Sequence, residues 1–411
     1  MDRNQKIYMI YRMFGYDYLF YTVINFLFFT QTKGLSVGQV MYLTGFYAMF
    51  GFIFQIPVNF IIERIGLKRS MNIGMISWIL HILIIIFTNN FFLFAIGEML
   101  SALGTTFKTI SEQQYIYQSL KQTGTRKEFA KFEGKSVSMF YVMEAVSALL
   151  VGMLFEVNNY IPIVLTLMFM LIALVLSLGF DDLKSEYKES KSSFKGYLRD
   201  FKRIFKSRRI KTIYLYVFLI TSIVTLTLTL EKSFIANINI SPVIYGVILS
   251  LFTMSIGIGS KLQYKFEEVT KRKTLTYIGF AITILIVLAG VINQIFIDIN
   301  IYFTLIATIF IFVIHSILQG IYRMSVKRYM NHFTTSDIRG KILSIFYICE
   351  GIGKSLIMFI SGYIIDNIGT NCTSISIGII ASILLVCILK FMKKYVGLDE
   401  EEYSPQDCYK S

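Results

Sequence analysis

Residues 134–144 read GKSVSMFYVME, and residues 340–350 read GKILSIFYICE. Six of the eleven positions are identical, and the matched residues lie 206 positions apart (340 minus 134). A weaker echo at an offset of 204 sets Glu63, Lys68 and Arg69 against Glu267, Arg272 and Lys273. Because both offsets are close to half of the 411 residues, the chain reads as a duplication of one unit.

Apolar stretches recur along both copies of this unit. The chain is 55% hydrophobic and 16% charged, which is too apolar for a soluble fold of its length. A helix needs about 20 apolar residues to cross the hydrocarbon core. Twelve stretches meet this length, at 7–30, 37–62, 70–88, 91–111, 136–156, 160–180, 212–231, 242–260, 274–292, 300–322, 341–365 and 373–390. The sequence therefore predicts an all-α integral membrane protein with twelve transmembrane helices in two pseudo-symmetric six-helix halves.

The formal charge of +14 is distributed unevenly over this topology. Only Lys33 and Lys232 fall on one side of the predicted spans, whereas the basic residues of the termini and the remaining loops fall on the other. The positive-inside rule places that basic side, with both termini, in the cytoplasm. We therefore expect a multi-pass protein of the cell membrane whose first span is an uncleaved anchor, and we ascribe the net charge to this topology and not to nucleic-acid binding.

Composition also divides the chain into segments. Residues 1–180 form the predicted N-terminal half, 181–211 a cytoplasmic linker, 212–392 the C-terminal half and 393–411 a cytoplasmic tail. Within the linker, apolar residues recur at helical spacing from Phe194 to Phe205 among Lys and Arg. This pattern is typical of a basic amphipathic helix on anionic headgroups. The alternative is a plain solvated linker.

Two loops resemble those of a known family. Residues 59–69 read NFIIERIGLKR, similar to the loop after the second span of the major facilitator superfamily: a small residue, an acid, a base, a Gly and two bases. Residues 112–121, EQQYIYQSLK, look like the segment after the fourth span of bacterial efflux-like members. The sequence departs from the family where Asn59 replaces Gly, Glu63 replaces Asp and Gln118 replaces Asp.

The resemblance implies a secondary transporter that works by alternating access, and by family habit proton-coupled efflux. It also implies a conformational latch at the first loop, formed by Asn59, Glu63, Arg64, Gly66, Lys68 and Arg69. The first, fourth, seventh and tenth spans line the cavity in this superfamily. Many proton-coupled members carry an Arg in the fourth span, where this chain has Glu98.

Ionisable and polar residues inside the spans are the candidates for substrate or proton binding, because each is costly in hydrocarbon without a partner or a water-filled cavity. On the first span Asp17, Tyr21 and Asn25 follow one helical face, with Asp17 about 15 Å deep. Asp17 is either functional or a structural partner of Arg12. Glu98 begins a similar stripe on the fourth span through Ser101, Thr105, Lys108 and Glu112.

The two repeat acids have different surroundings. Glu144 has no basic neighbour on its own helix and is a further candidate for proton binding. Glu350 has Lys354 one turn later, so we predict a structural ion pair.

Two further stripes of polar residues lie on the seventh and tenth spans. Thr221, Thr225 and Thr229 follow one face of the seventh, and the tenth carries Thr304, Thr308, His315, Gln319 and Tyr322. His315 and Gln319 join the substrate or proton candidates. The alternatives are packing for His315 and back-bonding of the Thr hydroxyls to their own helices.

Tyrosines crowd the first span, which favours an amphipathic small-molecule substrate, either cationic or neutral. Interfacial belts account equally well for the shallower tyrosines.

Other classes of protein fit less well. The sequence contains no HExxH, nucleophile elbow or Walker loop, which disfavours a membrane-embedded enzyme. The four scattered Cys predict no disulfide or metal site, and we expect no cofactor. A non-transporting receptor or scaffold would have little reason to retain buried acids. Uptake or facilitated diffusion remains an alternative to efflux, and we expect a monomer in the bilayer.

Overall fold

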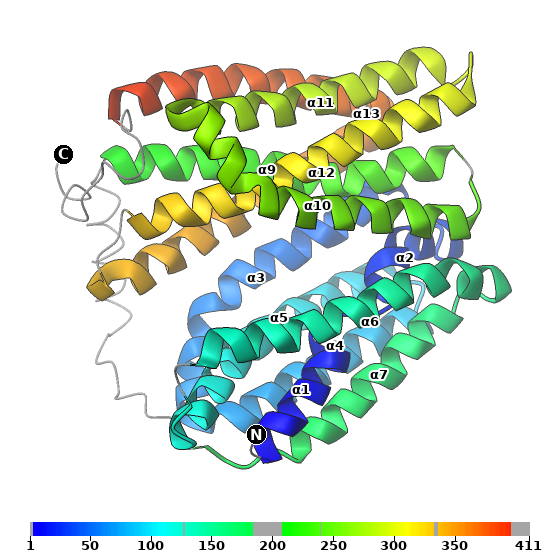
Figure 1. Cartoon of the computed structure of the whole chain (residues 1–411). Coiled ribbons are helices and arrows are strands. Elements are labelled where there is room, and N and C mark those ends of the chain that lie inside the picture. Colours follow the sequence, from blue (N-terminus) through cyan, green and yellow to red (C-terminus); the bar gives the residue numbers. More distant parts are fainter. Residues whose placement is uncertain (1–2, 126–127, 184–207, 239, 333–335, 396–411) are drawn as a thin grey trace. The chain divides into compact units, whose positions relative to one another are not determined.

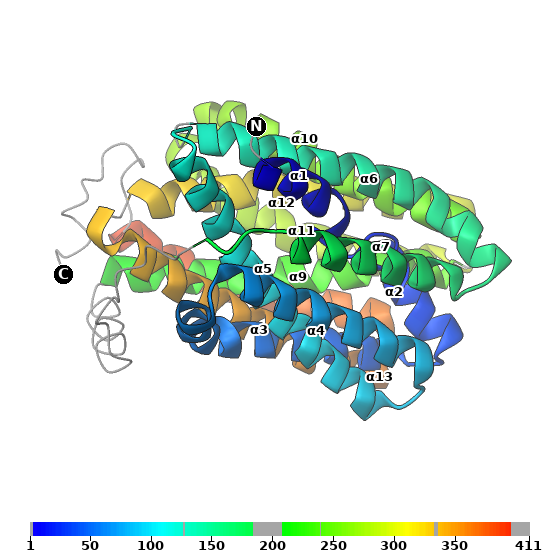
Figure 2. The ribbon, with the colours of Figure 1, turned by 90° about the horizontal axis from the view of Figure 1, so that it is seen from below.

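The computed structural model describes residues 3–125, 128–183, 208–238, 240–332 and 336–395, and these residues form helices joined by short turns (Figures 1 and 2). The helices of the first half are α1 (Arg3–Gly15), α2 (Tyr21–Leu27), the π-helical turn η1 (Phe28–Thr32), α3 (Val37–Ile65), α4 (Leu67–Phe87), α5 (Phe91–Gln122), α6 (Phe129–Val157) and α7 (Ile161–Leu178). Those of the second are α9 (Arg208–Asn237), α10 (Pro242–Thr270), the 3₁₀ turn η3 (Lys271–Lys273), α11 (Thr274–Phe296), α12 (Ile301–His332) and α13 (Ser336–Tyr395).

These helices give the twelve predicted spans. Ten helices of the described residues are long and apolar enough to cross a membrane. The first span is interrupted between α1 and α2 and so falls outside that count. α13 reverses at Gly369, where φ is 80° and ψ is 169°, and therefore holds two spans. The all-α, twelve-span prediction is confirmed.

The chain divides into two compact units. One comprises residues 1–190 with 241–247, and the other comprises residues 191–240 and 248–411. The predicted amphipathic helix at 194–205 and most of the predicted tail at 393–411 lie outside the described residues. The segment boundaries at 180, 211 and 392 therefore stay predictions.

Several helices run well beyond their apolar stretches. The fourth span, expected to end at 111, continues to Gln122, and the seventh, expected over 212–231, covers Arg208–Asn237. The extension of the fourth span is rich in Glu, Gln and Lys, which are good helix formers. Hydropathy marks the part of a helix that lies in lipid, so it misses polar turns at the ends. The extra turns bring Glu112 into ordered helix and place Glu231 inside α9 instead of at its end.

Glycines allow α4 and α5 to approach closely in the first unit. A Cβ on Gly74 would lie 2.6 Å from the Lys108 side chain and 2.9 Å from the Gly104 carbonyl. A Cβ on Gly104 would in turn lie 2.5 Å from the ring of Trp78. Small residues at such crossings let helix backbones meet in a membrane. Here they bring Lys108 and Trp78 together.

The second unit is built around α9, which packs mainly against α13, while α11 packs against both α12 and α13 (Figure 1). A Cβ on Gly353 of α13 would meet the Ser222 hydroxyl of α9 at 2.6 Å. On α10 and α12, Gly259 and Gly320 each face the backbone of the other helix. Close backbone contact therefore recurs in this unit.

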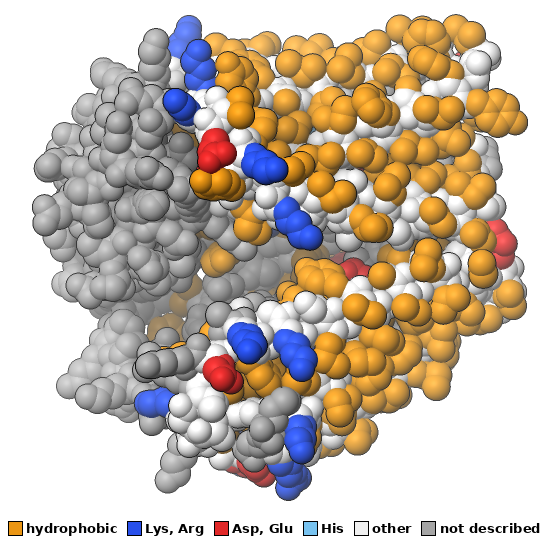
Figure 3. Space-filling view, in the orientation of Figure 1, with side chains coloured by type: hydrophobic (Ala, Val, Ile, Leu, Met, Phe, Trp, Pro, Cys, Tyr) orange, Lys and Arg blue, Asp and Glu red, His pale blue; other side chains and the backbone are white. Residues whose placement is uncertain are grey.

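The outer surface of each unit is strongly apolar. Side chains such as Val142, Val175, Met254 and Ile306 are more than 60% exposed. In the face shown by Figure 3, hydrophobic side chains cover most of the helices, and Lys and Arg gather toward one end in each unit. Exposed apolar surface of this extent fits contact with lipid chains.

The turn between α3 and α4 depends on Gly66. Its φ is 88° and its ψ is 164°, a conformation that is essentially restricted to glycine. Its carbonyl accepts a hydrogen bond from the Ser70 hydroxyl at 2.7 Å. Glu63, Arg64 and Arg69 around this turn are exposed, as is Asn59 on the last turns of α3.

We predict that Gly66→Ala lowers the thermal midpoint of the purified protein, whereas Gly51→Ala in the interior of α3 leaves it unchanged or raises it. A Cβ meets nothing within 4 Å at either position, so only the backbone conformation distinguishes them. The strain at Gly66 corresponds to about 1–3 kcal/mol, and alanine in a helix interior gains about 0.5–1 kcal/mol. Equal midpoints for the two variants would show that the turn relaxes freely.

Candidate functional site

The first span is broken where the sequence predicts one continuous helix. α1 ends at Gly15 and α2 begins at Tyr21, with Phe20 held at φ 64°. A break exposes carbonyls that have no water in a bilayer core, so other groups must bind them. Lys108 Nζ donates to the Gly15 carbonyl, and the Thr166 hydroxyl donates to the Leu19 carbonyl at 2.6 Å. The break is thus held from α5 and α7.

This break corrects the predicted stripe of Asp17, Tyr21 and Asn25. Asp17 does not share a helix with the other two, because it lies in the break itself. Its carboxylate accepts a hydrogen bond from its neighbour's amide, Tyr18 N, at 2.7 Å, and its side chain is exposed. Tyr21 and Asn25 do share a face of α2, the first buried and the second half-buried.

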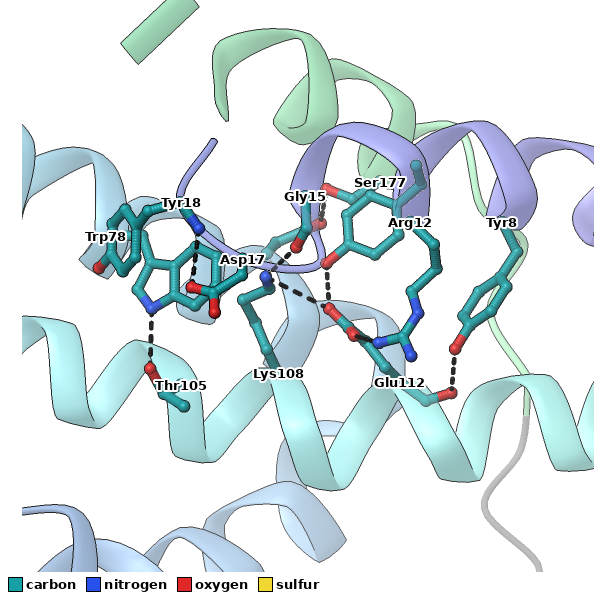
Figure 4. A network of polar contacts seen from close by, with 12 residues as sticks. Tyr8, Arg12, Gly15, Asp17, Tyr18, Trp78, Thr105, Lys108, Glu112 and Ser177 are labelled. Atoms are coloured by element: carbon teal, nitrogen blue, oxygen red, sulfur yellow. Dashed lines mark hydrogen bonds and ion pairs between the residues drawn. The ribbon is translucent and has the colours of Figure 1, made fainter. Parts of the chain in front are cut away.

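Arg12 does not pair with Asp17 but lies at the centre of a separate ionic cluster (Figure 4). Its guanidinium binds the Glu112 carboxylate of α5 and lies 2.5 Å from the Glu133 carboxylate of α6. The Tyr11 hydroxyl donates to Glu112 at 2.5 Å, and Lys108 Nζ lies 3.6 Å from it. Arg12, Glu112 and Lys108 are all at least 94% buried, and α1 is joined to α5 and α6 through them.

Lys108 connects this ionic cluster to the break. It donates to Gly15, pairs with Glu112 and interacts electrostatically with Asp17. Its Nζ also lies 3.3 Å from the centre of the Trp78 ring, a cation–π contact. A basic side chain on the fourth span is therefore present, although not at the position of Glu98.

Trp78, the only tryptophan of the chain, belongs to a cluster of aromatic rings beside the break. Tyr18 stacks on it with ring centres 4.3 Å apart, and Tyr18 and Tyr21 meet His81 edge-on at 5.5 and 5.7 Å. The Trp78 indole donates to Thr105 at 3.1 Å. Apart from Thr105, these side chains are buried, so the break is backed by a rigid aromatic wall.

Two further acids predicted from the sequence interact electrostatically with Asp17 or with the tyrosines of the aromatic cluster. Glu98 is half-buried on α5 and acts electrostatically on Tyr18, Tyr21 and Tyr47. Asp17 also acts electrostatically on Tyr47 of α3. Glu144 on α6 is half-buried and interacts with Asp17 across the unit. Asp17 therefore interacts with Glu144 directly, and it shares the neighbour Tyr47 with Glu98.

The remaining candidates lie in the second unit. His315 and Gln319 are one turn apart on α12 and are 1% and 0% exposed. The Thr225 and Thr304 hydroxyls bond back to their own helices, as the plain interpretation of the Thr stripes expects. Lys354 Nζ lies 3.8 Å from the Glu350 carboxylate, which also accepts a hydrogen bond from Thr221 at 3.2 Å.

Sequence reasoning missed Glu133, Trp78 and His81 as members of the site. Glu133 is separated from its partner Arg12 by 121 positions, so no local pattern joins them. Lys108 was noted only as part of a stripe. The cost of a basic residue deep in a span was the signal that could have singled it out.

This fold and a polar break inside a membrane-spanning segment define a membrane transporter. The family model described as Major Facilitator Superfamily matches residues 9–296 and 231–406, and the chain belongs to that family. Its members and the similar structures are transporters and not enzymes. No curated protein sequence matches the chain.

Solved structures with this fold include three with low sequence identity. The crystal structure of the nucleoside transporter NupG has a TM-score of 0.76 and 10% identity over 95% of this chain and 98% of its own. A D-xylose-proton symporter gives 0.67 and 13%, over 97% and 98%. A bacterial homologue of the human lysosomal transporter Spinster gives 0.67 and 14%, over 98% and 97%. At these identities the likeness concerns the fold.

We predict that Glu112→Gln destabilises the protein more than Glu133→Gln. Glu112 is 2% exposed and balances two buried cations, whereas Glu133 is 18% exposed and contacts Arg12 alone among the described cations. Removing one partner of a buried pair costs about 3–5 kcal/mol. Thermal unfolding of the two purified variants measures the difference, and equal losses would contradict this ranking.

For Glu350 and Lys354 we expect single neutralisations to lower abundance and the double variant Glu350→Gln, Lys354→Gln to recover part of the loss. An unpaired charge inside a span is the main cost, and the double variant removes it. Quantitative blotting of membranes measures abundance. Strictly additive losses would mean that the 3.8 Å contact is not energetically coupled.

Proposed function

We propose that this chain is a secondary active transporter that exports small amphipathic cations in exchange for protons by alternating access. The observation that carries the proposal is the position of Asp17. Its carboxylate is accessible within a break of the first span and has a lysine, a second acid and an aromatic wall close by.

The charge balance of the first unit supports a binding role for Asp17. Arg12 and Lys108 are matched by Glu112 and Glu133, so that ionic cluster is neutral without Asp17. The charge of Asp17 can then be neutralised by a proton or by a cationic substrate. Because one carboxylate cannot hold both, their competition couples the two fluxes.

The aromatic side chains support a cationic, partly apolar substrate. The ammonium of Lys108 already lies over Trp78, so this ring accepts a cation in the folded protein. The rings of Tyr18, Tyr21 and Tyr47 offer further aromatic faces to a cation, and Glu98 interacts electrostatically with all three. We propose that Glu98 tunes the range of substrates, while Glu144 assists Asp17.

The sequence supports the proposed direction and setting. The resemblance of residues 112–121 to efflux-like members supports export, and the charge distribution supports a cell membrane with both termini in the cytoplasm. We propose that the protein acts as a monomer. We also propose that the conformational latch is the loop of Asn59, Glu63, Arg64, Gly66, Lys68 and Arg69. Charged side chains of this loop are exposed beside the turn that Gly66 fixes, so they can form ion pairs with other charged groups.

The test uses proteoliposomes with an imposed pH gradient and tetraphenylphosphonium and ethidium as probe cations. We expect wild-type protein to concentrate a probe against its gradient and Asp17→Asn to lose this ability at least tenfold while remaining folded. Asp298→Asn, at an exposed position after α11, is the matched control and should retain wild-type rates.

Three outcomes would contradict the proposal. Wild-type accumulation by Asp17→Asn would exclude Asp17 from coupling. Transport of neither probe would remove the cationic substrate class. Accumulation that follows the proton inward, instead of opposing it, would reverse the direction and make the protein an uptake system.

A further inference from the structure

Helices α9 and α12 of the second unit run antiparallel and contact each other at two levels. The Thr221 hydroxyl of α9 and the Tyr322 hydroxyl of α12 lie 2.7 Å apart. About three to four turns away, the rings of Phe234 and Phe312 lie 5.9 Å apart. As the numbering rises on α9 it falls on α12, so the residues between these two contacts lie at matching levels on the two helices.

Three polar side chains lie between the two contacts. Glu231 precedes Phe234 by three residues, and His315 follows Phe312 by three, so both occupy the same level. Gln319 is one turn further along the same face of α12. Their exposures are 5%, 1% and 0%. Five of their atoms, one Glu231 oxygen, both His315 ring nitrogens and both Gln319 amide atoms, bind no group of the described residues.

Such a group of unsatisfied atoms is unusual in a folded protein. Buried polar atoms are nearly always hydrogen-bonded, and in hydrocarbon the cost of leaving them unpaired is higher still. By contrast, the neighbouring Thr221, Tyr322 and Glu350 are joined by hydrogen bonds. The atoms around Glu231 and His315 therefore point to a bound species that the protein itself does not supply.

The geometry restricts what that species is. All three side chains are at least 95% buried, so an organic substrate has no access to them. One carboxylate and one imidazole make a poor metal site, and the described residues contain no group of three His, Cys, Asp or Glu that could hold a metal. Water is the usual partner of buried polar atoms that the protein leaves unpaired, and a carboxylate with an imidazole is a proton-binding combination.

We propose that Glu231 and His315 form a proton-binding site inside the second unit, bridged by water that Gln319 orients. One proton resides on the Glu231 carboxyl or passes through water to a His315 ring nitrogen, leaving a carboxylate and an imidazolium. The inference rests on the proposed proton coupling, to which it adds a second site beyond Asp17.

The surroundings are compatible with this role. Phe234, Phe252 and Phe312 are each 1% exposed and close one end of the site, and the Thr221–Tyr322 contact closes the other. Lys232, the next residue on α9, acts electrostatically on Glu231. Glu350 and Lys354 lie at the Thr221 level, about 15 Å along the helix.

The test observes His315 directly. The chain contains three histidines, so protein labelled with ¹⁵N-histidine in liposomes gives few imidazole signals, and His315→Gln assigns the relevant one. We expect the His315 signal to change between pH 5 and pH 9 in wild-type protein. In Glu231→Gln the midpoint of the His315 titration should move by at least one pH unit, a tenfold change in proton affinity. In Lys232→Gln the His315 signal should still show one titration step, with a shifted midpoint.

The inference is wrong if the wild-type His315 signal, once assigned, is constant over this range. It is also wrong if Glu231→Gln titrates as wild type does. The measurement uses no substrate, and Asp17→Asn should leave the His315 response unchanged. Failure here therefore differs from failure of the transport test, which depends on the first unit.

Discussion

The first unit depends on how the carbonyls released by the break in its first span are satisfied. A transmembrane helix is tolerated in lipid because it bonds its own backbone, and an interruption forfeits that bonding. Lys108 and Thr166 replace it from α5 and α7. Because Lys108 is itself balanced by Glu112, which binds Arg12, the break, the ionic cluster and the accessible Asp17 form one connected arrangement. Gly74 and Gly104 make the arrangement possible by admitting Lys108 between α4 and α5.

Hydropathy and the internal repeat were sufficient to predict the architecture. Apolar length marks each span, and the match between Gly134 and Gly340 shows that one half repeats the other. The break escaped prediction because residues 15–20 contain no proline, and the local pattern around Asp17 continues at helical spacing. The groups that hold the interrupted helix include Lys108, more than 90 positions away, and single-span periodicity carries no information about such a partner.

The ion pairs also differ in whether local sequence spacing predicts them. Lys354 is one turn from Glu350, so sequence spacing alone suggests their contact. Arg12 meets Glu112 and Glu133 across 100 and 121 positions, and sequence suggested Asp17 only because it was the nearest acid. Glu231 was overlooked for another reason. The seventh span was ended at that residue by hydropathy, whereas α9 continues to Asn237 and buries it.

The position of Trp78 has an experimental consequence. It is the sole indole of the chain, and its ring lies between the phenol of Tyr18 and the ammonium of Lys108. Near-ultraviolet emission excited at the red edge therefore originates from one spot beside Asp17, without any attached dye. Quenching by the adjacent ammonium varies steeply with separation, so any rearrangement of the break alters the brightness of the whole protein. The molecule carries its own optical probe at the place where we locate coupling.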